Sequence, residues 1–229
     1  MKKLWQTEWF GIRFNDFIEV DSKNIVNEKF YEKFKSYDEL PEKYKSNKIG
    51  IAKDIIGFSK DYNEIMSIGC GNGIIESYIV MNSDKSIIAI EPSNNSKWLN
   101  NQNKVKFISG FFPSCIADEK KYTIGYCSSI DYVFNDDEYV SFFKSVYDYK
   151  FEQFYLTEVI TPPINMKSNL KYLIKGFLSN LGIYKHKGQF WGYLRTIDEH
   201  IDLLKKTGFK TINYGKHQHG NYWIKVENE

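Results

Sequence analysis

Short apolar runs alternate with amphipathic stretches through the middle of the chain. Strands are predicted at 64–68, 86–90, 105–109, 122–127 and 151–160, where β-branched and aromatic residues are concentrated. Apolar residues at helical spacing predict helices over about 45–59 and 73–81. Asn135, followed three residues later by Glu138, predicts the start of a helix that continues to about Val146. This alternation predicts a parallel sheet with helices on both faces.

The end of the chain follows a different pattern. Thr196 and Glu199 form a capping box that opens a predicted helix over 198–206, and Gly208 ends it. Two further strands are predicted at 210–214 and 221–226, joined by the turn-rich sequence GKHQHG. A closing antiparallel hairpin on a parallel sheet is unusual and narrows the choice of fold.

Length and composition are typical of one globular domain. The chain has 229 residues, of which 42% are hydrophobic and 26% charged, and its net charge is +2. Because it has neither a secretory leader nor an apolar run of about eighteen residues, we expect no membrane span and a cytoplasmic protein. The three cysteines, Cys70, Cys115 and Cys127, lack a paired metal spacing and are expected to be free thiols.

Three glycines follow the first predicted strand in the sequence MSIGCGNG at 66–73. A dinucleotide fingerprint needs a glycine where Ile74 stands, and a triphosphate loop needs a Lys that is absent. What remains is a G-x-G-x-G loop whose bare backbone lets a ligand lie across it. Glu91 ends the next strand, where its carboxylate can accept hydrogen bonds from both hydroxyls of a ribose or simply face solvent.

The order of the motifs MSIGCGNG, IIAIEPS, KFISGFFPS, YTIGYC and GFKTINYG…NYWIKVE resembles the class I S-adenosylmethionine-dependent methyltransferases. The resemblance covers about 45–160 and 196–227. It implies an α/β, Rossmann-like fold with a seven-stranded, mostly parallel sheet, an antiparallel last strand and helices on both faces. It also implies S-adenosyl-L-methionine as cofactor and S-adenosyl-L-homocysteine as product. The stretch FWGYLRTIDEHIDLLKKTGF is similar to small-molecule methyltransferases of surface-glycan or secondary-metabolite biosynthesis.

The resemblance also implies a set of cofactor-binding residues. By position, the methionine part and the ribose are faced by Gly69, Cys70, Gly71 and Gly73, and the ribose hydroxyls are held by Glu91. The adenine is surrounded by Pro92, Ser93, Gly110, Phe111 and Phe112. The pocket is closed by Cys127, Ser128 and Ser129. No acidic residue follows the third strand, so the contact to the adenine amino group is left open.

Direct displacement on the methyl group needs alignment above all, and a base chiefly when the nucleophile is a hydroxyl. The candidate bases are Asp131, Tyr132, Glu158, His186, His217 and His219, each of which could equally be a capped or solvated polar residue. Asp131 and His186 are the leading pair. No metal-ligand cluster follows the fourth strand, so metal-independent transfer is expected, with oxygen favoured over nitrogen as the target.

We expect two parts along the chain: an N-terminal lid at 1–44 and a methyltransferase domain at 45–229. The domain carries an insertion at about 162–195. The insertion contains lysines but no acidic residue, and apolar residues from Leu170 to Leu181 predict an amphipathic helix that Gly182 ends. Tyr132, Trp191, Tyr193 and Arg195 are predicted to bind the substrate, and an Arg195 fork suggests an anionic acceptor, such as a phosphorylated or nucleotide-linked sugar or metabolite. Packing and solvation are the alternative roles for the aromatic and basic residues.

Other functions stay open. A nucleic-acid methyltransferase, acting on RNA, is the nearest alternative; DNA is not expected because the target-base motifs are absent and the net charge is small. A nicotinamide-dependent oxidoreductase and an inactive cofactor-binding module are the others. The sequence does not indicate the oligomeric state.

Overall fold

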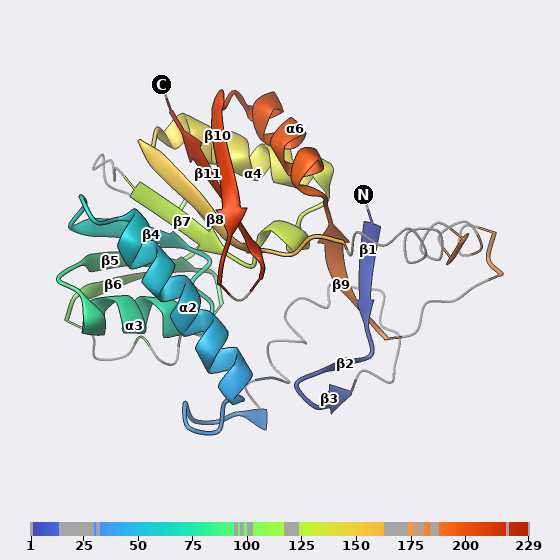
Figure 1. Cartoon of the computed structure of the whole chain (residues 1–229), viewed down its shortest axis with the longest axis horizontal. Coiled ribbons are helices and arrows are strands. Elements are labelled where there is room, and N and C mark those ends of the chain that lie inside the picture. The colour runs from blue at the N-terminus through green and yellow to red at the C-terminus, as the bar shows by residue number, and fades with distance from the viewer. Residues whose placement is uncertain are drawn as a thin grey trace.

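A seven-stranded sheet organises the chain (Figure 1). The computed structural model describes residues 2–13, 30, 33–93, 96, 99, 103–116, 124–162, 174–175, 178, 181–183, 188–218 and 220–228. The strands are β4 (Glu64–Ile68), β5 (Ser86–Glu91), β6 (Val105–Ser109), β7 (Ile124–Ser128), β8 (Gln153–Val159), β10 (Thr211–Lys216) and β11 (Tyr222–Glu227), in the spatial order β10-β11-β8-β7-β4-β5-β6. β11 is antiparallel to both of its neighbours, while the pairs from β8 to β6 are parallel. The predicted fold class is confirmed.

Helices cover both faces of this sheet, as the alternation predicted (Figure 1). α2 (Glu42–Phe58) and α3 (Ile74–Asn82) pack on one face, whereas α4 (Asp136–Tyr149) and α6 (Ile197–Thr207) pack on the other. Successive strand residues point to opposite faces, so Ile65 contributes to the α2 side and Met66 to the α4 side. Both predicted capping boxes are present, at Asn135 and at Thr196.

A second, two-stranded sheet was not predicted. β1 (Lys2–Gln6) pairs antiparallel with β9 (Gln189–Leu194), so the start of the chain lies beside the end of the insertion (Figure 1). A short hairpin of β2 (Glu8–Trp9) and β3 (Ile12–Arg13) follows β1. These elements surround a third apolar cluster, whose buried members are Ile12, Phe30, Phe34, Leu40, Ile74 and Trp191. The helix expected from Leu170 to Leu181 lies largely outside the described residues.

In the described part of the chain, no helix combines the length and the apolar character that crossing a membrane requires.

Candidate functional site

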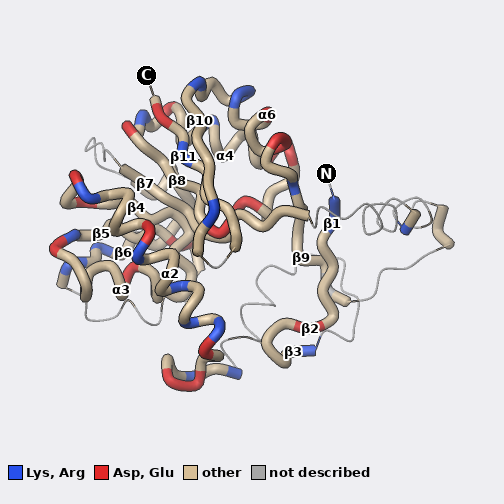
Figure 2. The backbone as a smooth tube through the Cα atoms, viewed as in Figure 1, with Lys and Arg blue, Asp and Glu red and all other residues tan. Residues whose placement is uncertain are grey.

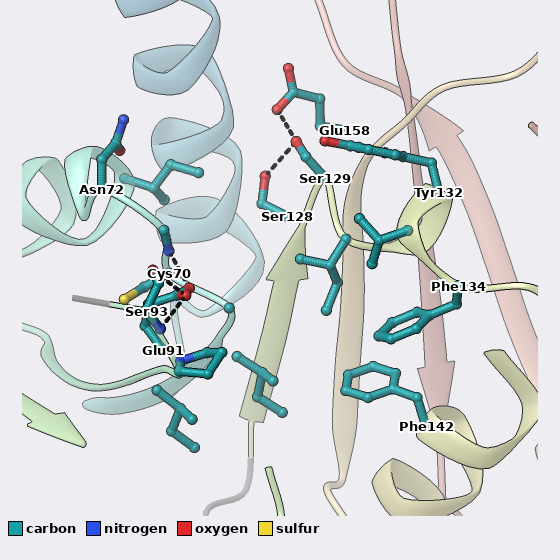
Figure 3. Close-up of a pocket in the computed structure, with 18 of the residues that line it drawn as sticks. Cys70, Asn72, Glu91, Ser93, Ser128, Ser129, Tyr132, Phe134, Phe142 and Glu158 are labelled. Atoms are coloured by element: carbon teal, nitrogen blue, oxygen red, sulfur yellow. Dashed lines mark hydrogen bonds between the residues drawn. The ribbon is translucent and has the colours of Figure 1, made fainter. Parts of the chain in front are cut away.

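A cavity of about 1510 Å³ opens at the carboxyl ends of β4, β5 and β7. β4 has β5 on one side and β7 on the other, and the connections from these strands therefore leave in opposite directions, which creates a crevice at this edge. Figure 3 shows Cys70, Glu91 and Ser93 on one wall, Phe134 and Phe142 on the opposite wall, and Ser128, Ser129 and Glu158 between them. Tyr132 lies on the side of Phe134, and its ring points towards Ser129 and Glu158.

The glycine loop after β4 forms part of one wall of the cavity. Gly69, Cys70 and Gly71 line the cavity. Gly71 has a φ of +54°, and a Cβ placed there would have no atom within 4 Å, so its backbone faces open space. Gly73 differs from the prediction, because it caps α3 with a φ of +81° and its Cα is covered by Leu99. Packing against Leu99 therefore requires a glycine at this position.

Glu91 connects this loop to the end of β5. Its Oε2 accepts a hydrogen bond from the Gly71 backbone N–H at 2.9 Å, and its Oε1 accepts from the Ser93 N–H at 3.0 Å and from the Ser93 hydroxyl at 2.7 Å. Glu91, Pro92 and Ser93 all line the cavity. Each carboxylate oxygen has more than one acceptor direction, so the group can also accept from a ligand hydroxyl.

The residues predicted to flank the adenine and to close the pocket line the cavity, with one exception. Gly110, Phe111 and Phe112 line the cavity, and Phe112 also packs edge-on against Phe142, with 6.3 Å between ring centroids. Ser128 and Ser129 line it too. The exception is Cys127, which precedes them on β7 and points into the core between the sheet and α4.

Lys48, Ser129 and Glu158 form a charged cluster that lines the cavity. The Lys48 ammonium, from α2, donates to Glu158 Oε2 at 2.6 Å and to Ser129 Oγ at 3.3 Å, and Ser129 also donates to Glu158. Burial is the largest single effect and disfavours the charged form of Lys48, but Glu158, Tyr44 and Tyr132 together outweigh it, so the Lys48 pKa is raised. Glu158 has a φ of +59°, and its backbone N–H donates to Nε2 of His217 at 3.4 Å.

Asp131, the predicted base, does not line the cavity. It begins the short 3-10 helix η1 (Asp131–Val133), is 3% exposed, and places Oδ2 3.6 Å from His200 Nε2. Burial raises the pKa of Asp131 to about 7 and lowers that of His200 to about 3. The position of Asp131 is therefore that of a buried polar group behind the cavity wall. His186, the other leading candidate, lies outside the described residues.

Of the four predicted substrate residues, Tyr132 and Trp191 line the cavity. Arg195 is 1% exposed, and its guanidinium donates to the Asp136 carboxylate at 2.9 Å and to the carbonyls of Asp131 and Phe134 at 3.1 and 2.7 Å. The prediction that Arg195 forms a fork for an anionic acceptor is wrong in this geometry, because its donors are directed at the protein.

Tyr193 does not line the cavity either. The pairing of β9 with β1 is irregular at this point, because Leu4 pairs with Gly192 whereas Trp5 pairs with Phe190. A β-bulge of this kind re-aims side chains, which explains why Trp191 and Tyr193 have different surroundings. The Tyr193 ring packs against Phe190, with 5.2 Å between centroids.

The sequence did not assign several residues that face the cavity. Trp9, Phe10 and Tyr44 form an aromatic wall together with Tyr132 and Trp191. The Trp9 ring centroid lies 5.1 Å from that of Trp191 and 6.2 Å from that of Tyr44. The high aromatic content of the N-terminal segment was the one feature that could have indicated them. Lys48 is one helical turn beyond Tyr44, but an amphipathic pattern does not distinguish it from a solvated lysine.

No protein-family model and no curated protein sequence matches this chain. Solved structures do share its fold. Human N-acetylserotonin methyltransferase in complex with SAM has a TM-score of 0.55 at 14% identity, over 80% of this chain and 51% of that chain. The mitomycin 7-O-methyltransferase MmcR has a TM-score of 0.59 at 13% identity, over 81% of this chain and 54% of that chain. Magnesium protoporphyrin IX methyltransferase from Synechocystis PCC 6803, with bound SAH, has a TM-score of 0.58 at 9% identity, over 91% of this chain and 98% of that chain.

The chain thus has the fold of SAM-dependent methyltransferases that act on small molecules. It spans about half the length of the first two of these structures, and almost the whole length of the third.

Replacing Arg195 tests its structural role. Arg195→Ala leaves the Asp131 and Phe134 carbonyls without their donor, so the free energy of unfolding should fall by about 1–3 kcal/mol. Urea denaturation followed by circular dichroism measures this change. The control is Lys206→Ala, at the far end of α6, which should change stability by about 0.5 kcal/mol or less. An unchanged stability of the Arg195 variant would contradict the assigned contacts.

The buried position of Asp131 predicts a pH effect. Its folded-state pKa is raised, so its stabilising contribution is present near pH 4 and is lost as the pH rises towards 7. Asp131→Asn removes this loss, and the variant should gain stability relative to the unmodified protein as the pH increases from 4 to 7. Denaturation midpoints across this range measure the difference. A stability difference that is constant with pH would show that Asp131 is not buried in this way.

Proposed function

We propose that the protein binds S-adenosyl-L-methionine along the glycine loop and uses it to methylate a small hydroxylated acceptor. The observation that supports this most is the link between Gly71 and Glu91 at the cavity surface, which combines an open backbone with a carboxylate at the end of the next strand. When bound, this cofactor supplies an electrophilic methyl group on a sulfonium. The protein's part is to align the acceptor with that group and to exclude water.

The acceptor side of the cavity favours a compound with a ring or another apolar body. Trp9, Tyr44, Tyr132 and Trp191 offer flat apolar surface, and Tyr44 and Tyr132 add a hydroxyl each. An anionic acceptor stays a prediction without support from Arg195, whose donors bind the protein. Lys48 is a cation that faces the cavity, and it is already bonded to Glu158.

Glu158 replaces Asp131 as the base in this proposal. It lines the cavity from the end of β8, next to the cofactor-side residue Ser129, and Lys48 favours its ionised form. An ionised carboxylate can take the proton of an acceptor hydroxyl as the oxygen attacks the methyl group. A metal-independent reaction stays a prediction; the described residues contain no cluster of three or more His, Cys, Asp or Glu side chains arranged to hold an ion.

The charge distribution gives the RNA alternative little support. Figure 2 shows Lys and Arg positions interspersed with Asp and Glu positions along the described backbone. Binding to a phosphate backbone depends on clustered basic side chains. The nicotinamide and inactive-module alternatives are separated from the proposal by the two experiments that follow.

Binding of S-adenosyl-L-homocysteine tests the cofactor assignment. Calorimetry should show binding of this product and of 5′-methylthioadenosine, which retains the ribose, but not of NADH. Glu91→Gln should weaken both adenosyl ligands by roughly 10- to 100-fold, because a charged acceptor of the ribose hydroxyls is lost. Glu152→Gln, just before the start of β8 and therefore at the opposite edge of the sheet, is the matched control and should leave both affinities unchanged. Binding of NADH without either adenosyl ligand would favour an oxidoreductase instead.

The role of Glu158 is tested by methyl transfer. Hydroxylated aromatic compounds are incubated with the protein and S-adenosyl-L-methionine, and products are identified by the added mass of a methyl group. For an acceptor found in this way, Glu158→Gln should lower kcat by about 10²- to 10⁴-fold, because the amide cannot accept the proton. Its amide oxygen still accepts from Lys48, so affinity for S-adenosyl-L-homocysteine should be retained. An unchanged kcat would exclude Glu158 as the base, and binding without transfer to any acceptor would favour the inactive module.

A further inference from the structure

A second buried carboxylate faces the same cavity. Glu76 lies in the first turn of α3, directly after the glycine loop, and is 1% exposed. Its Oε1 accepts hydrogen bonds from the Ser67 hydroxyl and the Tyr126 hydroxyl, each at 2.6 Å. Its Oε2 is buried and has no hydrogen-bond partner among the described residues. One half of the carboxylate is therefore fixed and the other half lacks a donor.

An unpaired buried carboxylate oxygen is costly, and at a cavity wall it indicates a missing donor. Burial raises the pKa of Glu76, while the charge of Lys48 acts in the opposite direction. The Lys48 ammonium is directed to Glu158 and Ser129, however, so it does not satisfy Oε2. A cationic donor in the cavity would both complete the hydrogen bonds of Glu76 and stabilise its charged form.

The glycine loop lies between Glu76 and Glu91. Cys70 and Gly71 of this loop line the cavity together with both carboxylates, and the Gly71 backbone N–H donates to Glu91. In the proposed function, Glu91 holds the ribose and the adenine lies towards Phe111 and Phe112. The amino-acid arm of the cofactor then extends across Gly71 in the other direction, towards Glu76.

We infer that Glu76 binds the α-ammonium group of the cofactor's amino-acid arm through Oε2. This inference rests on the proposed function. Among the cofactor's hydrogen-bond donors, the ribose hydroxyls are assigned to Glu91 and the adenine amino group lies at the opposite end. The sulfonium is positive but donates no hydrogen bond. The ammonium is the donor that combines positive charge with a position at this end of the loop.

Glu76→Gln is a sharp test because of the existing contacts. The amide oxygen still accepts from Ser67 and Tyr126, so the polar cluster between α3 and the sheet is preserved. The amide nitrogen takes the place of Oε2 and cannot accept from an ammonium. The variant therefore removes the proposed contact and keeps the internal ones.

Three ligands are compared by calorimetry: S-adenosyl-L-homocysteine, the same molecule without its α-amino group, and 5′-methylthioadenosine, which has no amino-acid arm. The unmodified protein should bind S-adenosyl-L-homocysteine roughly 10- to 100-fold more tightly than the deaminated analogue. Glu76→Gln should remove this preference. Its affinity for 5′-methylthioadenosine should stay within about threefold of the original value. Its affinity for the deaminated analogue should also stay within about threefold or increase, because the ligand's carboxylate is no longer repelled by the Glu76 carboxylate.

The matched control is Asp137→Asn. Asp137 is an exposed carboxylate on α4 that lines the same cavity, so the variant makes the same chemical change without altering the glycine loop. All three affinities should be unchanged. The comparison separates the contact to Glu76 from a general effect of negative charge around the cavity.

The outcomes are distinguishable. A preference for S-adenosyl-L-homocysteine that survives Glu76→Gln overturns the inference, and so does an equal weakening of all three ligands, which would indicate a structural role. If the variant does not fold, the unmodified protein still decides, because equal binding of the amino and deaminated ligands overturns the inference. If the unmodified protein binds none of the three, the proposed function itself fails.

Discussion

The parallel pairing of β4 with β5 on one side and β7 on the other is the constraint on which the site depends. It brings three carboxyl ends to one edge of the sheet, so Gly71 in the loop after β4, Glu91 at the end of β5 and Ser128 at the end of β7 line the same cavity. The same register sets Ser67 opposite Tyr126, and these two hydroxyls hold Glu76. The hydrogen bond from Gly71 to Glu91 then connects the loop after β4 to the end of β5.

Within this frame, the partners of each carboxylate decide what it can do. Glu91 accepts from backbone and hydroxyl donors at the cavity surface and can accept from further hydroxyls. Glu158 is held by a lysine, which favours the ionised form that a base needs. Asp131 is also acidic and stands between the cavity-lining residues Ile130 and Tyr132 in the sequence, but its side chain is turned towards His200 in the interior. Proximity along the chain does not distinguish these cases, whereas burial and partners do.

The central sheet was predictable from sequence because most of its strands are short, largely apolar runs that end at Gly, Pro or a polar residue. β4 and β6 have the predicted bounds, and both capping boxes were identified from two residues each. β9 was missed because its partner, β1, lies near the other end of the chain, and local pattern carries no information on such pairing. Arg195 was misassigned for a related reason: the carbonyls that it binds belong to η1 and to the residue after it, and sequence does not show which donors are already used.

Arg195 nevertheless supports the aromatic wall of the cavity indirectly. A Cβ at Gly192 would lie 2.1 Å from the Tyr132 carbonyl oxygen, so β9 is pressed against η1, the short helix that carries Tyr132. Arg195 binds the carbonyls of Asp131 and Phe134, on either side of Tyr132, and its guanidinium also lies over the Tyr139 ring of α4. The aromatic wall is therefore supported from behind by a buried cation that anchors η1 to the domain. Because the aromatic wall comes from β9, η1, α2 and the N-terminal segment, while the proposed cofactor contacts come from the ends of β4, β5 and β7 and the loop after β4, the proposed acceptor surface can change without altering the positions of Gly71 and Glu91.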